Sequence, residues 1–289
     1  MANELDWHRN KSGFAALLGP PLGWFLLFFA VPMAVVWAYS FGTNSGIADI
    51  EISGTFANYA RALEPLYLGI LGKSLAFAAL ATLICLIVAF PVALAISFAP
   101  PQLKTWLLIG VMLPFWTNLL IRTYALIAIL RDEGLLNMAL TSAFGWAGVG
   151  PLAIMNSNMA VMIGLVYVHL PFMVLPLYAA LDRLDRSLIE AALDLGAGHV
   201  RAIFTIVVPL AVPGILSGLL LTFIPVLGSY LAPDLLGGPD SQMIANVIER
   251  QFKRANDWPF GAALAFLLMY LTLFGIAAQA MMQRKRPVD

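Results

Sequence analysis

Six long apolar runs alternate with polar segments along the chain. The runs cover about residues 15–41, 74–99, 105–130, 159–181, 209–233 and 259–283. A helix needs about 20 mostly apolar residues to cross the hydrocarbon core of a bilayer, and each run is long enough. Helices are expected because a backbone exposed to lipid must satisfy its own hydrogen bonds. The pattern therefore predicts an all-α polytopic membrane protein with six transmembrane helices.

The composition agrees with a membrane protein. Of the 289 residues, 61% are hydrophobic and 11% are charged, whereas soluble domains carry about 25% charged residues. The formal net charge is +0, which gives no indication of a nucleic-acid partner. His, Cys, Asp and Glu nowhere cluster at the spacing of a metal site, and the six runs contain no Asp or Glu. We expect neither a metal site nor a catalytic residue on this chain.

Six spans place both termini on one side of the membrane, and the positive-inside rule selects that side. With cytoplasmic termini, basic residues are more numerous inside than outside. The inside set is Arg9, Lys11, Lys104, Arg183, Arg186, Arg201, Arg284, Lys285 and Arg286, and the outside set is Arg61, Lys73, Arg131, Arg250, Lys253 and Arg254. Residues 1–14 are thus predicted as a cytoplasmic N-terminal segment and 15–289 as the membrane domain. The link between the fourth and fifth spans then faces the cytoplasm.

That link contains the sequence EAALDLGAGHVRAIFTIVVP, from Glu190 to Pro209. We predict a short helix over 187–197, with Asp185 or Ser187 as its N-cap. Glu190 is expected in the first turn of this helix, where a carboxylate interacts favourably with the helix dipole. The link is therefore expected to begin with a helix outside the membrane.

A bend and a second helix are predicted next. Gly196 and Gly198 permit a sharp turn, and a helix resumes over 202–208 until Pro209 opens the fifth span. A solvated connecting loop is the alternative reading, but the link is rich in apolar residues for a simple loop. They are Ala191, Ala192, Leu195, Ile203 and Ile206. We therefore predict a docking element that presents an apolar surface with charged flanks to a soluble partner.

The same link carries a resemblance to a known family. Glu190-Ala191-Ala192, followed at fixed spacing by Gly196, Ile206 and Val208-Pro209, resembles the EAA loop of bacterial ABC importer permeases. The family has Leu before the proline, where this chain has Val208. Further stretches from about residue 55 onward resemble the spermidine/putrescine permeases. They are PFWTNLLIRTYAL (114–126), GLLN (134–137), GLVYVHLPFMVLPLY (164–178), LLGGPD (235–240) and DWPFGAA (257–263).

The resemblance implies a type I (MetI-like) ABC importer permease that moves polyamines into the cytoplasm by alternating access. It implies that the loop 187–209 couples to the ATPase through Glu190, Ala191, Ala192, Asp194, Gly196, Ile206 and Pro209. It also implies a location in the bacterial inner membrane. The partners that it implies are a second homologous permease, two copies of a cytoplasmic ATPase subunit and a periplasmic or lipid-anchored binding protein.

ATP is expected to bind another chain. The stretch GILGKS (69–74) only partly matches a nucleotide-binding loop, because the position that requires the first glycine holds Tyr67. The segment also leads into an apolar run, with no strand before it. We therefore expect no cofactor on this chain, and ATP and Mg on the partner ATPase subunits.

Aromatic side chains are the candidates for the substrate path, because their ring faces attract cations by about 0.5–2 kcal/mol each. The candidates are Trp116, Tyr124, Tyr167, Phe172, Phe223 and Tyr230. Asp234 and Asp240 are expected at the outer mouth, where they attract cations or contact the binding protein. The alternatives are ordinary packing for the rings and a solvated loop for the two carboxylates.

Two polar residues and two glycines within the spans are assigned structural roles. Arg122 is expected to hydrogen-bond carbonyls or a partner subunit, since a polyamine path should not be lined by a cation. His169 is expected to be packed and hydrogen-bonded. Gly214 and Gly218 form a G-x-x-x-G pair in the fifth run, which favours close helix packing.

Two other functions remain open from the sequence. The first is a permease of the same build for another solute, such as a different amine, an opine, thiamine or an iron complex. The second is a membrane enzyme or scaffold that merely shares six spans, which predicts that no ATPase binds the link.

Overall fold

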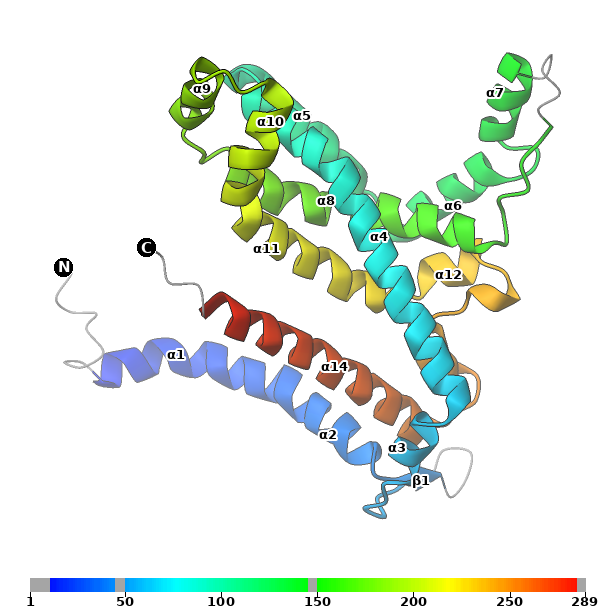
Figure 1. Ribbon diagram of the computed structural model, residues 1–289. Helices are drawn as coiled ribbons and strands as arrows, with labels where there is room; N and C mark the ends of the chain where they lie inside the picture. The colour runs from blue at the N-terminus through cyan, green and yellow to red at the C-terminus, as the bar shows by residue number, and fades with distance from the viewer. Residues whose placement is uncertain (1–10, 45–49, 145–149, 285–289) are drawn as a thin grey trace. The chain divides into compact units, whose positions relative to one another are not determined.

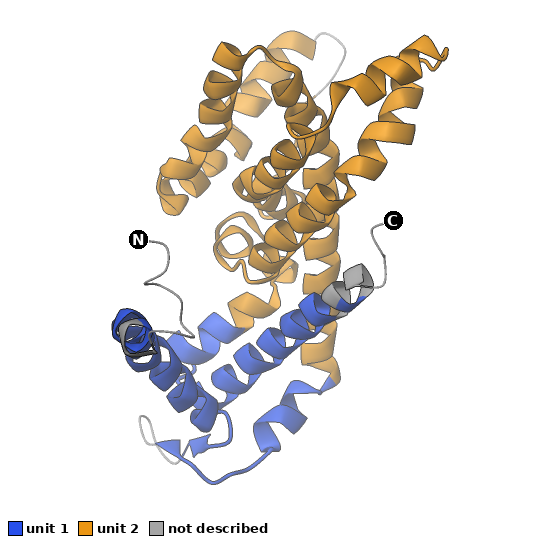
Figure 2. Cartoon of the chain, turned by 90° about the vertical axis from the view of Figure 1, so that its left-hand side faces the viewer, with its two compact units in different colours: residues 1–64, 248–289 blue, residues 65–247 orange. Residues whose placement is uncertain are grey.

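The computed structural model describes residues 11–44, 50–144 and 150–284 (Figure 1). Most of the described chain is helical, and the exceptions include a pair of two-residue strands. The chain divides into two compact units, Met1–Glu64 with Ile248–Asp289, and Pro65–Val247 (Figure 2). Most of the predicted cytoplasmic segment 1–14 lies outside the described residues, as do Arg9, Lys285 and Arg286 of the basic set.

The first apolar run forms one helical stretch with a π-helical turn inside it, in the first unit. It consists of α1 (Lys11–Phe25), a π-helical turn over Leu26–Ala30, and α2 (Val31–Tyr39). Pro32, in the first turn of α2, has no N–H to donate to the preceding turn. The wider turn before it accommodates the missing hydrogen bond, as π-bulges do.

The rest of the first unit pairs this helix with the last span. A short antiparallel pair joins β1 (Thr43–Asn44) and β2 (Ile50–Glu51), and α3 (Ala57–Ala62) follows. The last span is α14 (Trp258–Arg284). The Trp37 indole N–H donates to the Tyr270 hydroxyl at 2.8 Å, which ties α2 to α14.

Within the first unit, an ion pair joins α3 to the residue directly before α14. Arg61 on α3 lies 2.8 Å from a carboxylate oxygen of Asp257, and its guanidinium carbon lies 4.0 Å from the centre of the Phe260 ring. The amphipathic helix α13 (Ile244–Lys253) precedes Asp257 in the chain. It ends before Asn256, whose φ of 51° is incompatible with a continued helix.

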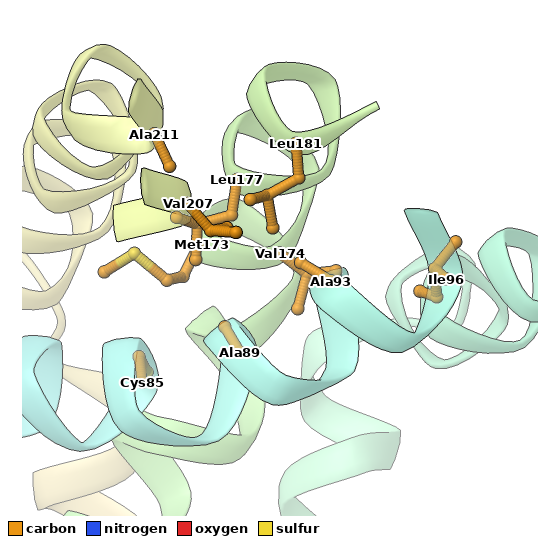
Figure 3. Close-up of a cluster of buried hydrophobic side chains, with 10 residues drawn as sticks. All are labelled: Cys85, Ala89, Ala93, Ile96, Met173, Val174, Leu177, Leu181, Val207 and Ala211. Atoms are coloured by element: carbon orange, nitrogen blue, oxygen red, sulfur yellow. The ribbon is translucent and has the colours of Figure 1, made fainter. Parts of the chain in front are cut away.

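Three long helices form the core of the second unit: α4 (Pro65–Phe98), α8 (Asn158–Leu181) and α11 (Val208–Leu227). Their contact surface combines small residues on α4 (Cys85, Ala89 and Ala93) and the larger Ile96 with large residues on α8 (Figure 3). Its buried members are Cys85, Ala89, Ala93, Ile96, Met173, Val174, Leu177, Leu181, Val207 and Ala211. Small side chains on one helix let the larger ones of its neighbour interdigitate, which is how closely packed membrane helices are held together.

The third predicted run, 105–130, is divided in the structure. It forms α5 (Pro101–Trp116) and α6 (Leu119–Leu130), and the helical stretch before the break is inclined by 94° to the one after it. Thr117 has an extended backbone, and the Asn118 side chain caps α6 by accepting the N–H of Leu120 at 2.8 Å. A single straight span over 105–130 is therefore not formed. The described chain has five helices long enough to cross a membrane, or up to six if the bent pair is counted as one.

The remaining runs agree with the sequence in position but differ in extent. The second begins earlier, at Pro65, and the fourth is α8. The fifth is part of one continuous helical stretch, His199–Leu227, which ends before the predicted limit at residue 233. The second unit also contains α7 (Leu135–Phe144), α12 (Leu231–Leu236) and a 3-10 turn over Pro239–Ser241.

Candidate functional site: the link between α8 and α11

The predicted docking element begins with α9 (Arg186–Asp194). The Asp185 carboxylate accepts the backbone N–H of Ser187 at 3.0 Å, so Asp185 is the N-cap. Because the cap is Asp185 and not Ser187, the helix starts two residues earlier. Glu190 therefore lies beyond the first turn, and the expectation that it sits there is wrong.

A glycine in the left-handed region ends α9. Gly196 has φ of +85°, a conformation that side chains other than glycine rarely adopt. The N–H of Gly196 donates to the Leu193 carbonyl at 2.9 Å, and the N–H of Ala197 donates to the Ala192 carbonyl at 3.0 Å. These bonds satisfy the free carbonyls at the end of the helix. The bend predicted at Gly196 is confirmed.

A second helix starts immediately after the bend. It runs through α10 (His199–Ala202) and a π-helical turn, Ile203–Val207, into α11 without interruption. Pro209 therefore lies inside a continuous helix and does not open it, which corrects the sequence expectation. The π turn before it provides for the N–H that proline lacks.

One face of α9 is packed and the other is free. Leu184, just before the helix, and Ile189 pack against the core cluster of α4, α8 and α11. Leu195 at the end of α9 is 90% exposed, and Val200 and Phe204 of the second helix are 69% and 67% exposed. Large apolar side chains at such exposure mark a surface for another partner.

The residues assigned to coupling lie along this exposed segment. Glu190, Ala191, Asp194, Gly196 and Pro209 are exposed, and Ala192 and Ile206 are partly buried. Their contact with an ATPase stays a prediction, since it concerns a second chain.

Charged residues border the link. Lys104 near the start of α5 forms an ion pair with Asp182 at the end of α8, and the hydrogen bond from Lys104 lowers the pKa of the Asp182 carboxyl. The Ser187 backbone N–H lowers the pKa of the Asp185 carboxyl in the same way. Arg186, the first residue of α9, donates to the Ser97 carbonyl on α4 at 2.9 Å. This contact was not predicted from the sequence.

The aromatic residues that were predicted to line the substrate path lie on several helices and on the segment before α12. Trp116 ends α5, Tyr124 is on α6, Tyr167 and Phe172 are on α8, Phe223 is on α11, and Tyr230 precedes α12. Phe172 packs edge-on against Phe115 of α5, with ring centres 5.3 Å apart. Trp116 is 76% exposed and Tyr124 is 59% exposed on this chain. Their contact with substrate stays a prediction.

Arg122 and His169 lie close to this ring contact. Arg122 is 8% exposed, and its guanidinium carbon lies 5.6 Å from the centre of the Phe115 ring. Its Nε atom has no hydrogen-bond partner within the part of the chain that the structure describes, so the carbonyl bond expected there is not formed by that atom. His169 is buried, with Nδ1 at 2.8 Å from the Leu165 carbonyl oxygen, which confirms its packed and hydrogen-bonded role.

Two acidic residues were predicted at the outer mouth. Asp234 on α12 and Asp240 in the 3-10 turn are exposed, and their contact with cations or with a binding protein stays a prediction. An open hollow of about 420 Å³ was not predicted from the sequence. It is lined by Ile127, Arg131, Asp132, Glu133, Met155 and Asn156. The adjacent charges of Arg131-Asp132-Glu133 directly after α6 were the available signal. Among the described residues, no three His, Cys, Asp or Glu are grouped to hold a metal ion.

Comparisons with known proteins agree on one class of protein, the membrane components of binding-protein-dependent transporters. The sequence model of the family described as "Binding-protein-dependent transport system inner membrane component" matches residues 22–287. The chain is 43% identical over 263 residues to the "Spermidine/putrescine transport system permease protein PotB" of Salmonella typhimurium (strain SL1344), covering 90% of each chain. It is 42% identical over 249 residues to the protein of the same name from Escherichia coli (strain K12), covering 86% of this chain and 89% of the relative.

A solved structure shares the fold. The crystal structure of a bacterial ABC transporter involved in the import of the acidic polysaccharide alginate contains a chain that matches with a TM-score of 0.78. The match covers 98% of both chains at 19% sequence identity. This likeness places the fold among the ABC importer permeases, as the type I (MetI-like) expectation requires.

Proposed function

Since the chain belongs to the family of binding-protein-dependent transport system inner membrane components, we propose that it is the permease subunit of a polyamine importer. The substrate class is inferred from the 42–43% sequence identity to spermidine/putrescine permeases over most of the chain. The matches cover 90% and 86% of this chain. Spermidine and putrescine are the proposed substrates.

The proposed energy source is ATP hydrolysis on separate subunits. We assign two copies of a cytoplasmic ATPase subunit, with their ATP and Mg, to the exposed surface of the link 187–209. Leu195, Val200 and Phe204 supply apolar area on that surface, and Glu190 and Asp194 supply charge beside it. The link and both termini are then cytoplasmic, and this chain itself hydrolyses nothing.

The proposed cycle is alternating access. A binding protein outside the membrane delivers the polyamine to this chain and a second, homologous permease. When the ATPase subunits close on ATP, they draw the two links together, and the path opens outward. Hydrolysis then restores the inward-facing form and releases the solute into the cytoplasm.

The proposed path uses ring faces in place of carboxylates. The predicted runs hold no Asp or Glu, so the rings of Trp116, Tyr124, Tyr167 and their partners compensate part of the lost hydration of an amine. The exposure of Trp116 and Tyr124 leaves these rings free to meet a solute or the second permease. Any carboxylate in the path then comes from the partner chain.

One experiment tests both the class and the substrate. The complex of this chain with the second permease, the ATPase and the binding protein is reconstituted in liposomes with spermidine, putrescine or thiamine. We expect spermidine or putrescine to stimulate ATP hydrolysis and to accumulate inside, and thiamine to do neither. Stimulation by thiamine alone would show that the chain belongs to an ABC importer of another solute and not of polyamines. Purification without any ATPase would contradict the coupling surface itself.

A further inference from the structure

The last turn of α4 contains a carbonyl that its own helix cannot satisfy. The Ser97 carbonyl would normally accept an N–H from the residue three or four positions later. Those residues are Pro100 and Pro101, and neither has an N–H. Ser97 is only 2% exposed, so an unmet acceptor there is costly. The sequence therefore requires a donor from elsewhere in the fold.

Arg186 supplies that donor. Its Nη2 atom donates to the Ser97 carbonyl at 2.9 Å, and its guanidinium carbon lies 5.1 Å from the centre of the Phe98 ring. A cation is favoured at this place, because the carboxyl end of a helix carries partial negative charge. The bond is also charge-assisted, and such bonds are stronger than neutral ones. The first residue of α9 is thereby attached to the end of α4, next to the start of α5 (Figure 1).

An ion pair lies beside the bond between Arg186 and Ser97. Lys104 on α5 pairs with Asp182 at the end of α8, and the charge of Arg186 also helps to lower the pKa of the Asp182 carboxyl. The ends of α4, α5 and α8 are therefore joined to α9 by one group of charged side chains. This group adds to the packing of Ile189 on the core cluster.

The chain itself connects α9 only to α8 and, through the Gly196 bend, to α10 and α11. The third core helix, α4, is distant in sequence and is reached across space. We propose that Arg186 is a positioning residue that transmits displacement of α9 to α4 through the Ser97 carbonyl. The inference rests on the proposed function, because it assumes that an ATPase moves α9. It assigns to Arg186 the task of moving α4 together with α8 and α11.

The test compares how tightly ATP hydrolysis is coupled to transport in reconstituted complexes that contain either the unsubstituted chain or a variant. Spermidine and its binding protein are the probe. Arg186→Met keeps an unbranched side chain without the charge or the N–H donors, and Arg186→Gln keeps a polar end on a side chain that is too short to replace the guanidinium. Arg183→Ala is the matched control, since Arg183 is an exposed cation three residues earlier in the same link. Three quantities are measured: ATPase copurification, spermidine-stimulated hydrolysis, and spermidine transported per ATP hydrolysed.

We expect Arg186→Met and Arg186→Gln to retain the ATPase but to transport about five-fold less spermidine per ATP, within the range of known coupling mutations. Arg183→Ala should leave that ratio unchanged. An unchanged ratio in an assembled Arg186 variant would overturn the inference, since a merely structural role would lower hydrolysis and transport in proportion. Failure of both variants to assemble would also overturn it, because Arg186 would then serve assembly. Absence of the ATPase from the unsubstituted complex would instead refute the proposed function, and the role of Arg186 with it.

Discussion

A Cβ atom on Gly214 of α11 would lie 2.4 Å from the Cβ atom of Ala180 on α8 and 2.9 Å from the Pro176 carbonyl oxygen. Real Cβ atoms do not approach other atoms so closely, so the two helices meet at this glycine without room for a side chain. Gly218, one turn later, faces Met173 in the same way. The close helix packing expected of this G-x-x-x-G pair is confirmed.

The first prediction concerns this contact. Gly214→Ala should destabilise the purified chain by about 1–3 kcal/mol, because α8 and α11 must separate to accept the methyl group. Gly110→Ala on α5 is the matched control, since a Cβ there meets nothing within 4 Å. That change should be neutral or stabilising by up to about 1 kcal/mol, because alanine is the better helix former. Thermal unfolding in detergent compares the two, and equal midpoints would contradict the packing argument.

The second prediction concerns the bend after α9. Gly196→Val should cost about 1–3 kcal/mol of local backbone strain, because a β-branched residue is placed at φ of +85°. We expect transport to be lost while the binding protein still captures spermidine. Gly198→Ala is the control, because Gly198 has φ of −71° and open space around it. Normal transport by Gly196→Val would show that the shape of this bend does not matter for coupling.

The third prediction concerns the exposed leucine on the proposed ATPase surface. Leu195 is 90% exposed, so Leu195→Ser removes little packing within the chain and should leave its thermal stability nearly unchanged. If the ATPase buries this side chain, its loss should weaken the complex by about 1.5–3 kcal/mol. The measurement is ATPase retention on immobilised permease. The control is Leu63→Ser, at a 60% exposed leucine in a predicted outer segment. Equal retention by both variants would count against the surface.

The fourth prediction concerns the Lys104–Asp182 pair and its dependence on pH. The pKa of Asp182 is lowered from its usual value of 3.8 in the folded chain. The pair therefore stabilises the fold above that value, and the contribution is lost as the pH falls through the lower, folded pKa. Because both side chains are partly exposed, we expect a coupling of only about 0.2–1 kcal/mol.

A double-mutant cycle measures that coupling. Lys104→Met, Asp182→Asn and the double variant are unfolded at neutral pH and again near pH 3. The coupling should be present at neutral pH and smaller in acid. A charge exchange, Lys104→Asp with Asp182→Lys, should recover part of it at neutral pH. A coupling that stays constant between the two pH values would mean that the two side chains do not act as an ion pair.

The sequence determined the features that depend on neighbouring residues. Apolar runs of membrane-spanning length identified α4, α8, α11 and α14, because a helix in lipid must be apolar over its full length. Gly196 marked the end of α9, since a left-handed residue favours glycine whatever surrounds it. The EAA pattern identified the link for the same reason, because it is a local spacing of residue types.

The tertiary structure decided the features that depend on residues far apart in the chain. No local pattern predicts that Arg186 meets Ser97, 89 positions away, although Pro100 and Pro101 show that the Ser97 carbonyl needs a donor. Likewise, Phe172 was chosen from the sequence for its ring, but its packing against Phe115 depends on how α5 lies against α8. Spans are fixed by transfer of each segment into lipid, residue by residue. Contacts between helices are fixed by the bend angles and side-chain volumes of several segments at once, which only the folded chain brings together.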